Sequence, residues 1–268
     1  MREILNDLEN VTETLDPEEK ARAASRMPLP KRFYENVTID NMRGDEQSEN
    51  SFQVFLDGRP VKTPARHALS LPTEQLAQLV ANEFSMQEKV IDPAKMPVTR
   101  LVNTVIDGII DNIEPIFEDI LRFLGTDMLF YRADAPKELV ERQRQQWDPI
   151  LDWAATRLGA HFILSEGVMH VTQSQEAISA VKLHLRNFTS PFALGALHSM
   201  TTLMGSALLA LAVAEGELNM DDAWRLAHLD EDWTIEQWGE DEEALKRRAY
   251  HGEEAFAAAA ILRALKEH

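Results

Sequence analysis

Carboxylates and tryptophans are concentrated in one stretch of the sequence, residues 230–243. So many carboxylates, with His228 just before them and His251 just after, are groups that can bind a metal ion or transfer protons. However, the stretch has no His-Glu-x-x-His motif and no helical Glu-x-x-His pair, and Ile235 stands where a calcium loop requires glycine. No two carboxylates are singled out as an acid–base pair. We therefore predict no metal and no catalytic residue, and a metal-assisted hydrolase using the carboxylates of 230–243 stays an alternative.

The two tryptophans of this stretch allow two interpretations. Residues five apart on a helix lie about 140° apart around its axis, so Trp233 and Trp238 cannot both face one core seam. In the first interpretation, each packs beneath a different helix and the acids are a solvated face. In the second, aromatic and acidic groups share a partly exposed patch, a composition typical of protein–protein hot spots. On the second interpretation, the candidate partner-binding residues are Trp233, Glu236, Trp238, Glu240 and Asp241.

Nucleotide and nucleophile motifs are missing from the sequence. It has no Gly-x-x-x-x-Gly-Lys-Ser/Thr, no Gly-x-Gly-x-x-Gly between a strand and a helix, and no Gly-x-Ser-x-Gly. The absence of cysteine excludes disulfides, cysteine-ligated metals and thiol nucleophiles. The sequence therefore predicts no nucleotide and no cofactor.

The charge is strongly acidic, with 27 Lys plus Arg against 45 Asp plus Glu and a formal net charge of −18. This field opposes phosphate backbones and anionic membranes, so we expect no nucleic acid and no membrane partner. One local basic cluster, Arg59, Lys62 and Arg66, is interpreted as a solvated turn. Residues 1–26 are rich in acids and lack both a basic start and an apolar run, so we expect a cytoplasmic protein without a signal peptide.

The elements that position these residues indicate a two-domain α+β protein. Residues 1–115 are predicted to form a small, mostly antiparallel β domain with flanking helices, in which the strand entered at Lys31 continues to Ile39. A hairpin is expected at 52–64, because alternating apolar residues precede Asp57-Gly58 and Gly58 tolerates positive φ. Residues 116–268 are predicted to be an orthogonal-type helical bundle. A short helix is also expected to begin near Asp16.

Helical periodicity dominates after residue 72. Thr73, Ser174 and either Asn219 or Asp221 are expected N-caps. Pro149 is predicted to kink or divide the helix that Pro136 opens. The run from 192 to 214 has no charged side chain and is interpreted as one central core helix rather than a membrane span, since it holds several hydroxyl residues and a histidine. Gly195 and Gly205 are expected to allow close helix contacts.

Three separated blocks of sequence resemble one protein family. They are Leu-Asp-Gly-Arg-Pro-Val-Lys-Thr-Pro from Leu56, Leu-Ser-Leu-Pro-Thr from Leu69, and Met-Pro-Val-Thr-Arg-Leu-Val-Asn-Thr from Met96. The segment from Trp233 to Glu240 adds to the likeness. Together they resemble the assembly chaperone of the F-type ATP synthase known in mitochondria as ATP synthase F1 complex assembly factor 2. The resemblance implies a bacterial member that binds the unassembled alpha subunit of the catalytic sector until the beta subunit replaces it. A generic holdase is the other alternative.

Overall fold

The computed structural model describes residues 29–42, 51–167 and 169–266. Contacts divide it into two units, Met1–Phe33 with Met86–Asp92, and Tyr34–Ser85 with Pro93–His268. In the described part of the first unit, Lys31 forms an antiparallel bridge with Val90. The second unit holds all the described helices and strands. The short helix expected near residue 16 lies outside the described residues.

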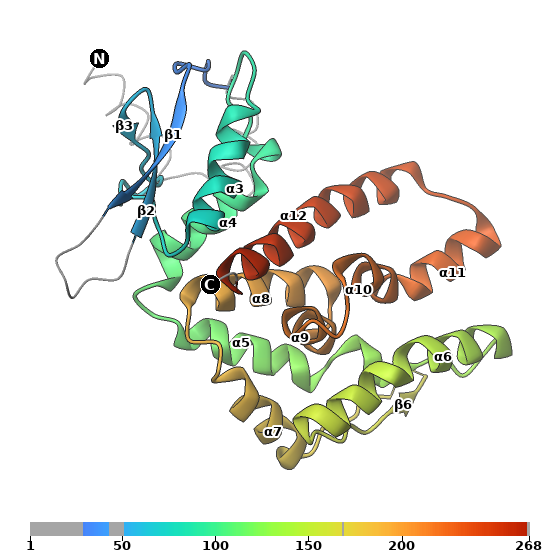
Figure 1. The fold of residues 1–268 in the computed structure, drawn as a ribbon. Coiled ribbons are helices and arrows are strands. Elements are labelled where there is room, and N and C mark those ends of the chain that lie inside the picture. Colours follow the sequence, from blue (N-terminus) through green and yellow to red (C-terminus); the bar gives the residue numbers. More distant parts are fainter. Residues whose placement is uncertain (1–28, 43–50, 168, 267–268) are drawn as a thin grey trace, which may run out of the picture. The chain divides into compact units, whose positions relative to one another are not determined.

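The second unit begins with a small antiparallel sheet (Figure 1). The strand β2 (Ser51–Leu56) pairs with β1 (Val37–Met42), β3 (Arg59–Pro60) and β4 (Ser70–Leu71). Alternation along β2 places Val54 and Leu56 in the core, as the sequence predicts. The hairpin turn is confirmed, with φ of 47° at Asp57 and 77° at Gly58.

Two of the predicted strands are shorter than expected. The first begins at Val37 rather than at Lys31, because Lys31 pairs with Val90 in the other unit. The return strand ends at Pro60 rather than at Pro64. Proline has no N–H to donate, so the two prolines of this segment end the regular ladder early.

Ten α-helices follow the first strands of the described chain (Figure 1). They are α3 (Glu74–Ser85), α4 (Pro97–Thr104), α5 (Glu114–Gly125), α6 (Lys137–Trp153), α7 (Gln175–Leu185), α8 (Pro191–Met204), α9 (Ala207–Glu215), α10 (Met220–Ala227), α11 (Leu229–Trp238) and α12 (Glu242–Lys266). Shorter elements are the 3-10 turns η1 (Pro93–Lys95) and η3 (Met128–Phe130), the π-helical turns η2 (Val105–Ile109) and η4 (Ala154–Leu158), and the parallel pair β5 (Tyr131–Arg132) and β6 (Ser165–Glu166). The predicted α+β class is confirmed.

Side-chain caps define several of these helix starts. The hydroxyl of Thr73 accepts from the Leu76 amide, and that of Ser174 accepts from the Ala177 amide at 3.1 Å. For α10, Asn219 is the cap rather than Asp221, since its side-chain oxygen accepts from the amide of Asp222 at 2.8 Å. Each acceptor satisfies an amide that has no partner within its own helix.

The apolar run from 192 to 214 is two helices, so the prediction of one central helix is wrong. Gly205 ends α8 with a left-handed φ of 66°, and Ser206 begins α9 by accepting from the Leu209 amide at 3.0 Å. A glycine in this conformation followed by a serine cap is a stop and a start signal. Both helices are buried in the second unit, and none of the described helices is long and apolar enough to cross a membrane.

The predicted division of the helix at Pro149 is wrong, since α6 runs through this proline undivided, and the alternative of a kink stays a prediction. Pro149 lies on the exposed side of the helix, where the carbonyl that loses its partner can bind water. The helix changes instead at Ala154, where the π-helical turn η4 begins, and Gly159 ends it at φ 69°, as expected.

The helix α8 lies at the centre of the helical core and packs along α12 (Figure 1). Gly195 allows η2 to approach it closely, because a Cβ at this position would lie 2.6 Å from Val105 Cγ2. Gly205 has a different role from the expected one, since its positive φ ends the helix. Of the two glycines, Gly195 is therefore the one needed for close packing.

Polar contacts, one of them buried, connect the sheet-bearing part of the second unit to α12. The Thr73 hydroxyl, at the start of α3, donates to the carbonyl of Ala264 in α12 at 2.9 Å. The Arg100 guanidinium of α4 donates to Tyr250 and to Glu254 of α12, both at 2.8 Å. The predicted boundary between residues 115 and 116 stays a prediction.

A buried carboxylate fixes the junction of η3 and α9. Asp127 accepts from the Leu129 amide at 3.1 Å, the Ser206 hydroxyl at 2.9 Å and the Leu208 amide at 3.0 Å. Burial raises the pKa of Asp127 to about 6, against the opposing effect of these hydrogen bonds. One side chain therefore caps two helices that lie far apart in sequence.

Candidate protein-binding surface

The acidic stretch folds as the helix α11, a turn, and the start of α12 (Figure 1). Asp230, Glu231 and Asp232 occupy the first turn of α11, where carboxylates stabilise the positive end of the helix dipole. Gly239 follows the last residue of the helix with φ 91°, a value that favours glycine. The positions of the acids and of this glycine therefore set both ends of α11.

The first half of the stretch is paired with the rest of the protein. Arg142 of α6 donates to both carboxylate oxygens of Glu236, at 2.8 and 2.7 Å. The same guanidinium carbon lies 4.8 Å from the centre of the Trp233 ring. The hydrogen bond from Arg142 lowers the pKa of Glu236 below its ordinary value. Trp233 and Glu236 are therefore part of the contact between α6 and α11.

The acids of the first turn also have partners within the fold. Asp230 accepts from the side-chain amide of Gln143 at 2.8 Å, and Asp232 accepts from the Arg248 guanidinium of α12. Arg248 lies 3.8 Å from Glu231 as well. These contacts attach α11 to α6 and α12, and they account for the acids at its start.

The second half of the stretch faces solvent. Trp238 is 78% exposed, which is the highest value among the exposed large apolar side chains of the described residues. Glu240 is exposed and has no hydrogen-bond or ion-pair partner in the described chain. The exposed carboxylate of Asp241 accepts from the Glu243 amide at 2.8 Å and the Ala244 amide at 3.2 Å, so Asp241 caps α12. We call Trp238, Glu240 and Asp241 the outer turn.

The five predicted site residues thus lie on one helix and the turn after it, but in two different settings. Trp233 is half-buried and Glu236 is paired, whereas the three residues of the outer turn are exposed. An exposed tryptophan offers the large rigid apolar surface that is enriched in protein–protein hot spots, and the carboxylate beside it adds a charge. The arrangement is suited to binding another protein.

The arrangement offers little support for the alternative of a metal-assisted hydrolase. Within the described ranges, no group of three or more His, Asp or Glu side chains is placed to hold a metal ion. His228, the histidine nearest the acids, has its ring Nδ1 2.8 Å from the Trp224 carbonyl and its ring centre 4.2 Å from that of Trp224. Burial lowers the pKa of His228, which favours its neutral form.

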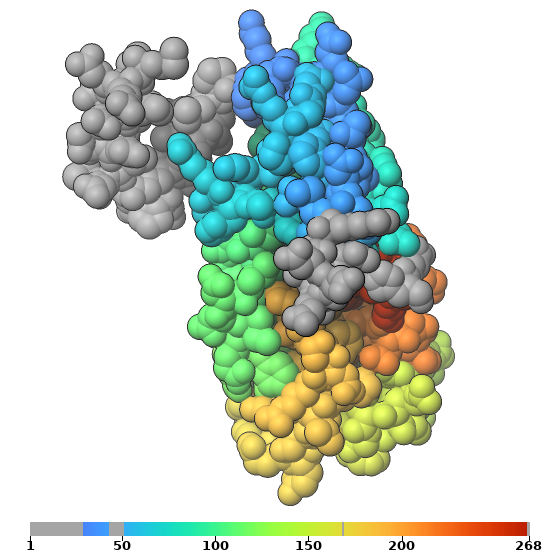
Figure 2. Space-filling view, turned by 60° about the vertical axis from the view of Figure 1, so that its left-hand side comes forward, coloured from blue at the N-terminus to red at the C-terminus, as the bar shows by residue number. Residues whose placement is uncertain are grey.

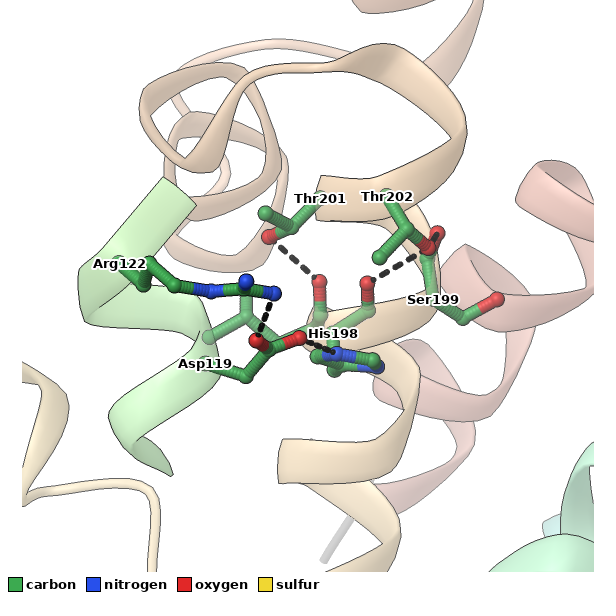
Figure 3. A network of polar contacts seen from close by, with 7 residues as sticks. Asp119, Arg122, His198, Ser199, Thr201 and Thr202 are labelled. Atoms are coloured by element: carbon green, nitrogen blue, oxygen red, sulfur yellow. Dashed lines mark hydrogen bonds and ion pairs between the residues drawn. The ribbon is translucent and has the colours of Figure 1, made fainter. Parts of the chain in front are cut away.

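A second polar cluster, between α5 and α8, contains histidine, aspartate and serine (Figure 3). The Nε2 atom of His198 lies 2.7 Å from Asp119, which also accepts from Arg122. The hydrogen bond from His198 and the charge of Arg122 lower the pKa of Asp119. However, the hydroxyl of Ser199 points away from the imidazole (Figure 3). The cluster therefore joins two helices and does not activate a nucleophile.

The hydroxyl groups next to this cluster are also bound within their own helix. Thr201 donates to the Leu197 carbonyl at 2.8 Å, and Thr202 donates to the carbonyls of His198 at 3.1 Å and Ser199 at 2.9 Å (Figure 3). Side-chain bonds of this kind to the preceding turn are common for threonine in helices. They leave these hydroxyls in structural roles.

Arg142 and Arg248 are the residues of this surface that sequence reasoning missed. Each is one of many cations on helices with an ordinary polar face, and its partner lies 94 or 16 residues away. No local pattern indicates such a pairing. Only the acids themselves, whose excess over nearby cations calls for distant partners, give a signal.

Comparisons with known proteins find relatives by sequence and by structure. A sequence model of the family described as ATP12 chaperone protein matches residues 31–155. Protein atp12, mitochondrial, from Schizosaccharomyces pombe is 26% identical over 237 residues, which cover 83% of this chain and 79% of that protein. The Atu1473 protein from Agrobacterium tumefaciens is 52% identical, with a TM-score of 0.85 over 99% of this chain and 97% of that one.

Atp12 from Paracoccus denitrificans is also similar in structure. It is 36% identical to this chain, with a TM-score of 0.81 over 88% of this chain and 99% of the other. These relatives define the class of protein as a chaperone. The chain belongs to the ATP12 chaperone family, which is the family of ATP synthase assembly chaperones expected from its sequence blocks.

Proposed function

We propose that this chaperone acts in assembly of the catalytic sector of the F-type proton-translocating ATP synthase by binding the unassembled alpha subunit. It shields the surface that the beta subunit later covers, and it is displaced when the beta subunit binds. The proposal is supported by membership of the ATP12 family. It also includes a cytoplasmic setting and the absence of any catalytic step.

The outer turn is the surface that we assign to the alpha subunit. The observation that carries this assignment is the 78% exposure of Trp238 beside the unpaired carboxylate of Glu240. Burying an indole against a partner contributes a large part of the free energy of many interfaces. Trp233 and Glu236 flank the turn, and we propose that their contact with Arg142 holds it in place.

Shielding follows from the physics of stable subunit interfaces. Such interfaces are large and apolar, so a lone subunit exposes a surface that promotes aggregation. A chaperone that covers part of this surface lowers the concentration of free, sticky subunit. Release requires only that the beta subunit binds with a more favourable free energy than the chaperone does. No ATP hydrolysis by the chaperone is needed.

The proposal is tested by the aggregation of purified alpha subunit after dilution from denaturant, followed by light scattering. Wild-type protein is expected to suppress scattering at a near-equimolar ratio. Glu240→Lys and Trp238→Ala are expected to remain folded and to need about tenfold more protein for the same effect, because hot-spot substitutions cost about 1.4 kcal/mol or more. Equal protection by both variants and by wild type would contradict the assignment of the outer turn.

Matched controls separate this site from charge and apolarity in general. Glu253→Lys makes the same charge change at an exposed position of α12, and Leu183→Ala removes a 71% exposed apolar side chain from α7. Both controls are expected to protect as wild type does. If all four variants lose protection equally, the effect is unspecific and the site lies elsewhere.

The generic holdase is distinguished by a pulldown from cell extract. A dedicated chaperone is expected to retain one dominant protein, the alpha subunit of the ATP synthase, and to lose it in the Glu240→Lys variant. Recovery of many unrelated proteins in similar amounts would support the holdase instead.

A further inference from the structure

Strand β3 and the loop that follows it carry the basic cluster that the sequence places in a solvated turn. The side chains of Arg59, Lys62 and Arg66 are exposed, and none of the three has a hydrogen-bond or ion-pair partner in the described chain. Most other cations of the second unit differ in this respect, as Arg100, Arg142 and Arg248 illustrate by pairing with acids. In a protein with a net charge of −18, three such cations within eight residues of sequence make a local excess of positive charge.

The loop is held in one conformation by contacts at both of its ends. Lys62 and Ala68 form an antiparallel bridge, and the Leu69 amide donates to the Val61 carbonyl at 3.3 Å. Leu69 has no exposed surface and anchors the returning chain in the core. The cyan part of the chain that includes this loop lies at the surface in Figure 2.

A carboxylate from η2 fastens the centre of the loop. Asp107 accepts from the Thr63 hydroxyl at 2.5 Å and from the Ala65 amide at 3.1 Å, and it lies 2.9 Å from His67 Nδ1. Asp107 lies in the π-helical turn η2. Such turns are rare in proteins, and those that occur are often found at functional sites. The loop is therefore ordered by a residue more than forty positions away.

The same loop contains a strained backbone position. Arg66 has φ of 69°, in the left-handed region, which is unfavourable for a residue with a Cβ. Its amide donates to the Thr63 carbonyl at 2.8 Å, which closes a tight turn. Strain of this kind persists where surrounding contacts determine it, and it is concentrated at binding sites. A solvated turn alone requires neither the strain nor the carboxylate contact.

We propose that residues 59–68 form a preformed docking site for an acidic polypeptide segment of a partner protein. Arg and Lys side chains bind carboxylates through charge-assisted hydrogen bonds, and a loop that is already ordered loses little entropy on binding. The inference stands independently of the role assigned to the outer turn, since it uses different residues and names a different chemistry.

The rest of the charge distribution favours a short acidic segment over other anions. A nucleic acid carries closely spaced charges along its whole length, so it extends beyond three cations into the field of an acidic protein. A membrane surface does the same over a wider area. A few carboxylates on a flexible chain match the cluster without meeting that field, because salt screens it beyond about 8 Å.

The test is a titration of the labelled full-length protein with a glutamate dodecapeptide at 150 mM salt, followed by amide NMR shifts. Shifts are expected at residues 59–68 and at Asp107. The variant Arg59→Glu/Lys62→Glu/Arg66→Glu is expected to raise the half-saturating concentration at least tenfold, which corresponds to three exposed charge pairs. The control variant Arg144→Glu/Arg157→Glu/Arg186→Glu, with the same charge change at exposed positions outside the loop, is expected to bind as wild type does.

Three outcomes overturn the proposal. They are the absence of shifts in the loop, equal weakening in both triple variants, and the same loop shifts produced by inorganic phosphate at equal concentration, which would indicate a small-anion site. Asp107→Asn tests the preformed conformation separately. It makes the protein less negative, so simple charge attraction predicts tighter peptide binding, whereas loss of loop order predicts several-fold weaker binding. Tighter or equal binding by this variant contradicts a preformed site.

Discussion

The helices α8 and α11 are organised in opposite ways. Most residues of α8 are buried, and it is held by apolar side chains such as Leu194, Leu197 and Met200. In α11, Leu229 is the only buried residue, and the helix is held by hydrogen bonds and ion pairs from Arg142 and Arg248. A helix attached by a few polar contacts at one side leaves its other side chains free. This is the structural reason that α11 and the turn after it can present a binding surface.

The largest difference is expected for a large-to-small substitution in each helix. Leu197→Ala in α8 removes a side chain with no exposed surface and should lower the free energy of unfolding by about 2–5 kcal/mol. Ile235→Ala in α11 removes a half-buried side chain and should cost about 1 kcal/mol or less. Urea unfolding measures both. Equal costs would show that α11 is held by apolar packing after all.

A smaller effect is expected at the contact between α11 and α6. Trp233→Ala removes the ring beneath the Arg142 guanidinium, and with it a cation–π contact and half-buried apolar surface. The expected loss is about 1–2 kcal/mol of unfolding free energy, measured in the same way. Trp233→Phe keeps a ring under the guanidinium and should recover most of it. Failure of phenylalanine to recover stability would argue against the ring contact.

The next effect is a difference in pH dependence between a buried carboxylate, Asp127, and a paired one, Glu236. Burial raises the pKa of Asp127 to about 6, above its ordinary value of 3.8. Between these two pH values, Asp127 is therefore protonated more in the native state than in the unfolded state. Its contribution to stability therefore grows as pH falls, by about 1 kcal/mol from pH 7 to pH 5. The cost of Asp127→Asn should be larger at pH 5 by that amount, as measured by urea unfolding.

Glu236 is expected to show the opposite trend. Its pKa is lowered below 4.5 by the Arg142 hydrogen bond, so its contribution is complete above 4.5 and is lost as pH falls through the lower value. The cost of Glu236→Gln should therefore be constant from pH 7 to pH 5 and should shrink below pH 4.5. Parallel pH trends for the two variants would contradict the difference between the buried and the paired carboxylate.

The smallest effect on stability is expected at Trp238. Trp238→Ala should change the free energy of unfolding by less than about 0.5 kcal/mol, because the indole is 78% exposed. The same variant should lose much of the fluorescence that iodide quenches in wild type, whereas Trp233→Ala should lose less. A destabilisation of 1 kcal/mol or more would mean that Trp238 packs within the fold, and the outer turn would lose its assigned role.

Local signals in the sequence predicted local structure well. The hairpin at Asp57-Gly58 and the caps at Thr73 and Ser174 follow from residue types at fixed short spacings. The break at Gly205-Ser206 has a similar local signal, but the uninterrupted apolar run around it favours a single helix. Composition suggests a buried segment, and it takes the glycine and its cap to divide that segment in two.

Polar pairs between residues far apart in the chain could not be predicted from the sequence. The contact of Arg142 with Glu236, and those of Asp127 with Ser206 and Leu208, join residues roughly 80 to 94 positions apart. Nothing about each residue alone distinguishes it from an ordinary surface arginine or a helix-start aspartate. The predicted site residues were therefore found as a cluster in sequence, but their division into paired and exposed groups came only from the fold.

The bond from the Thr73 hydroxyl to the Ala264 carbonyl has a consequence for how the protein is made. Its two ends are 191 residues apart, so on a ribosome adding about 5–20 residues per second the acceptor emerges roughly 10–40 s after the donor. Until α12 has been synthesised, the faces of α3, α4 and α8 that later receive it are uncovered. The nascent chain of the chaperone therefore exposes apolar surface itself until α12 packs against these helices.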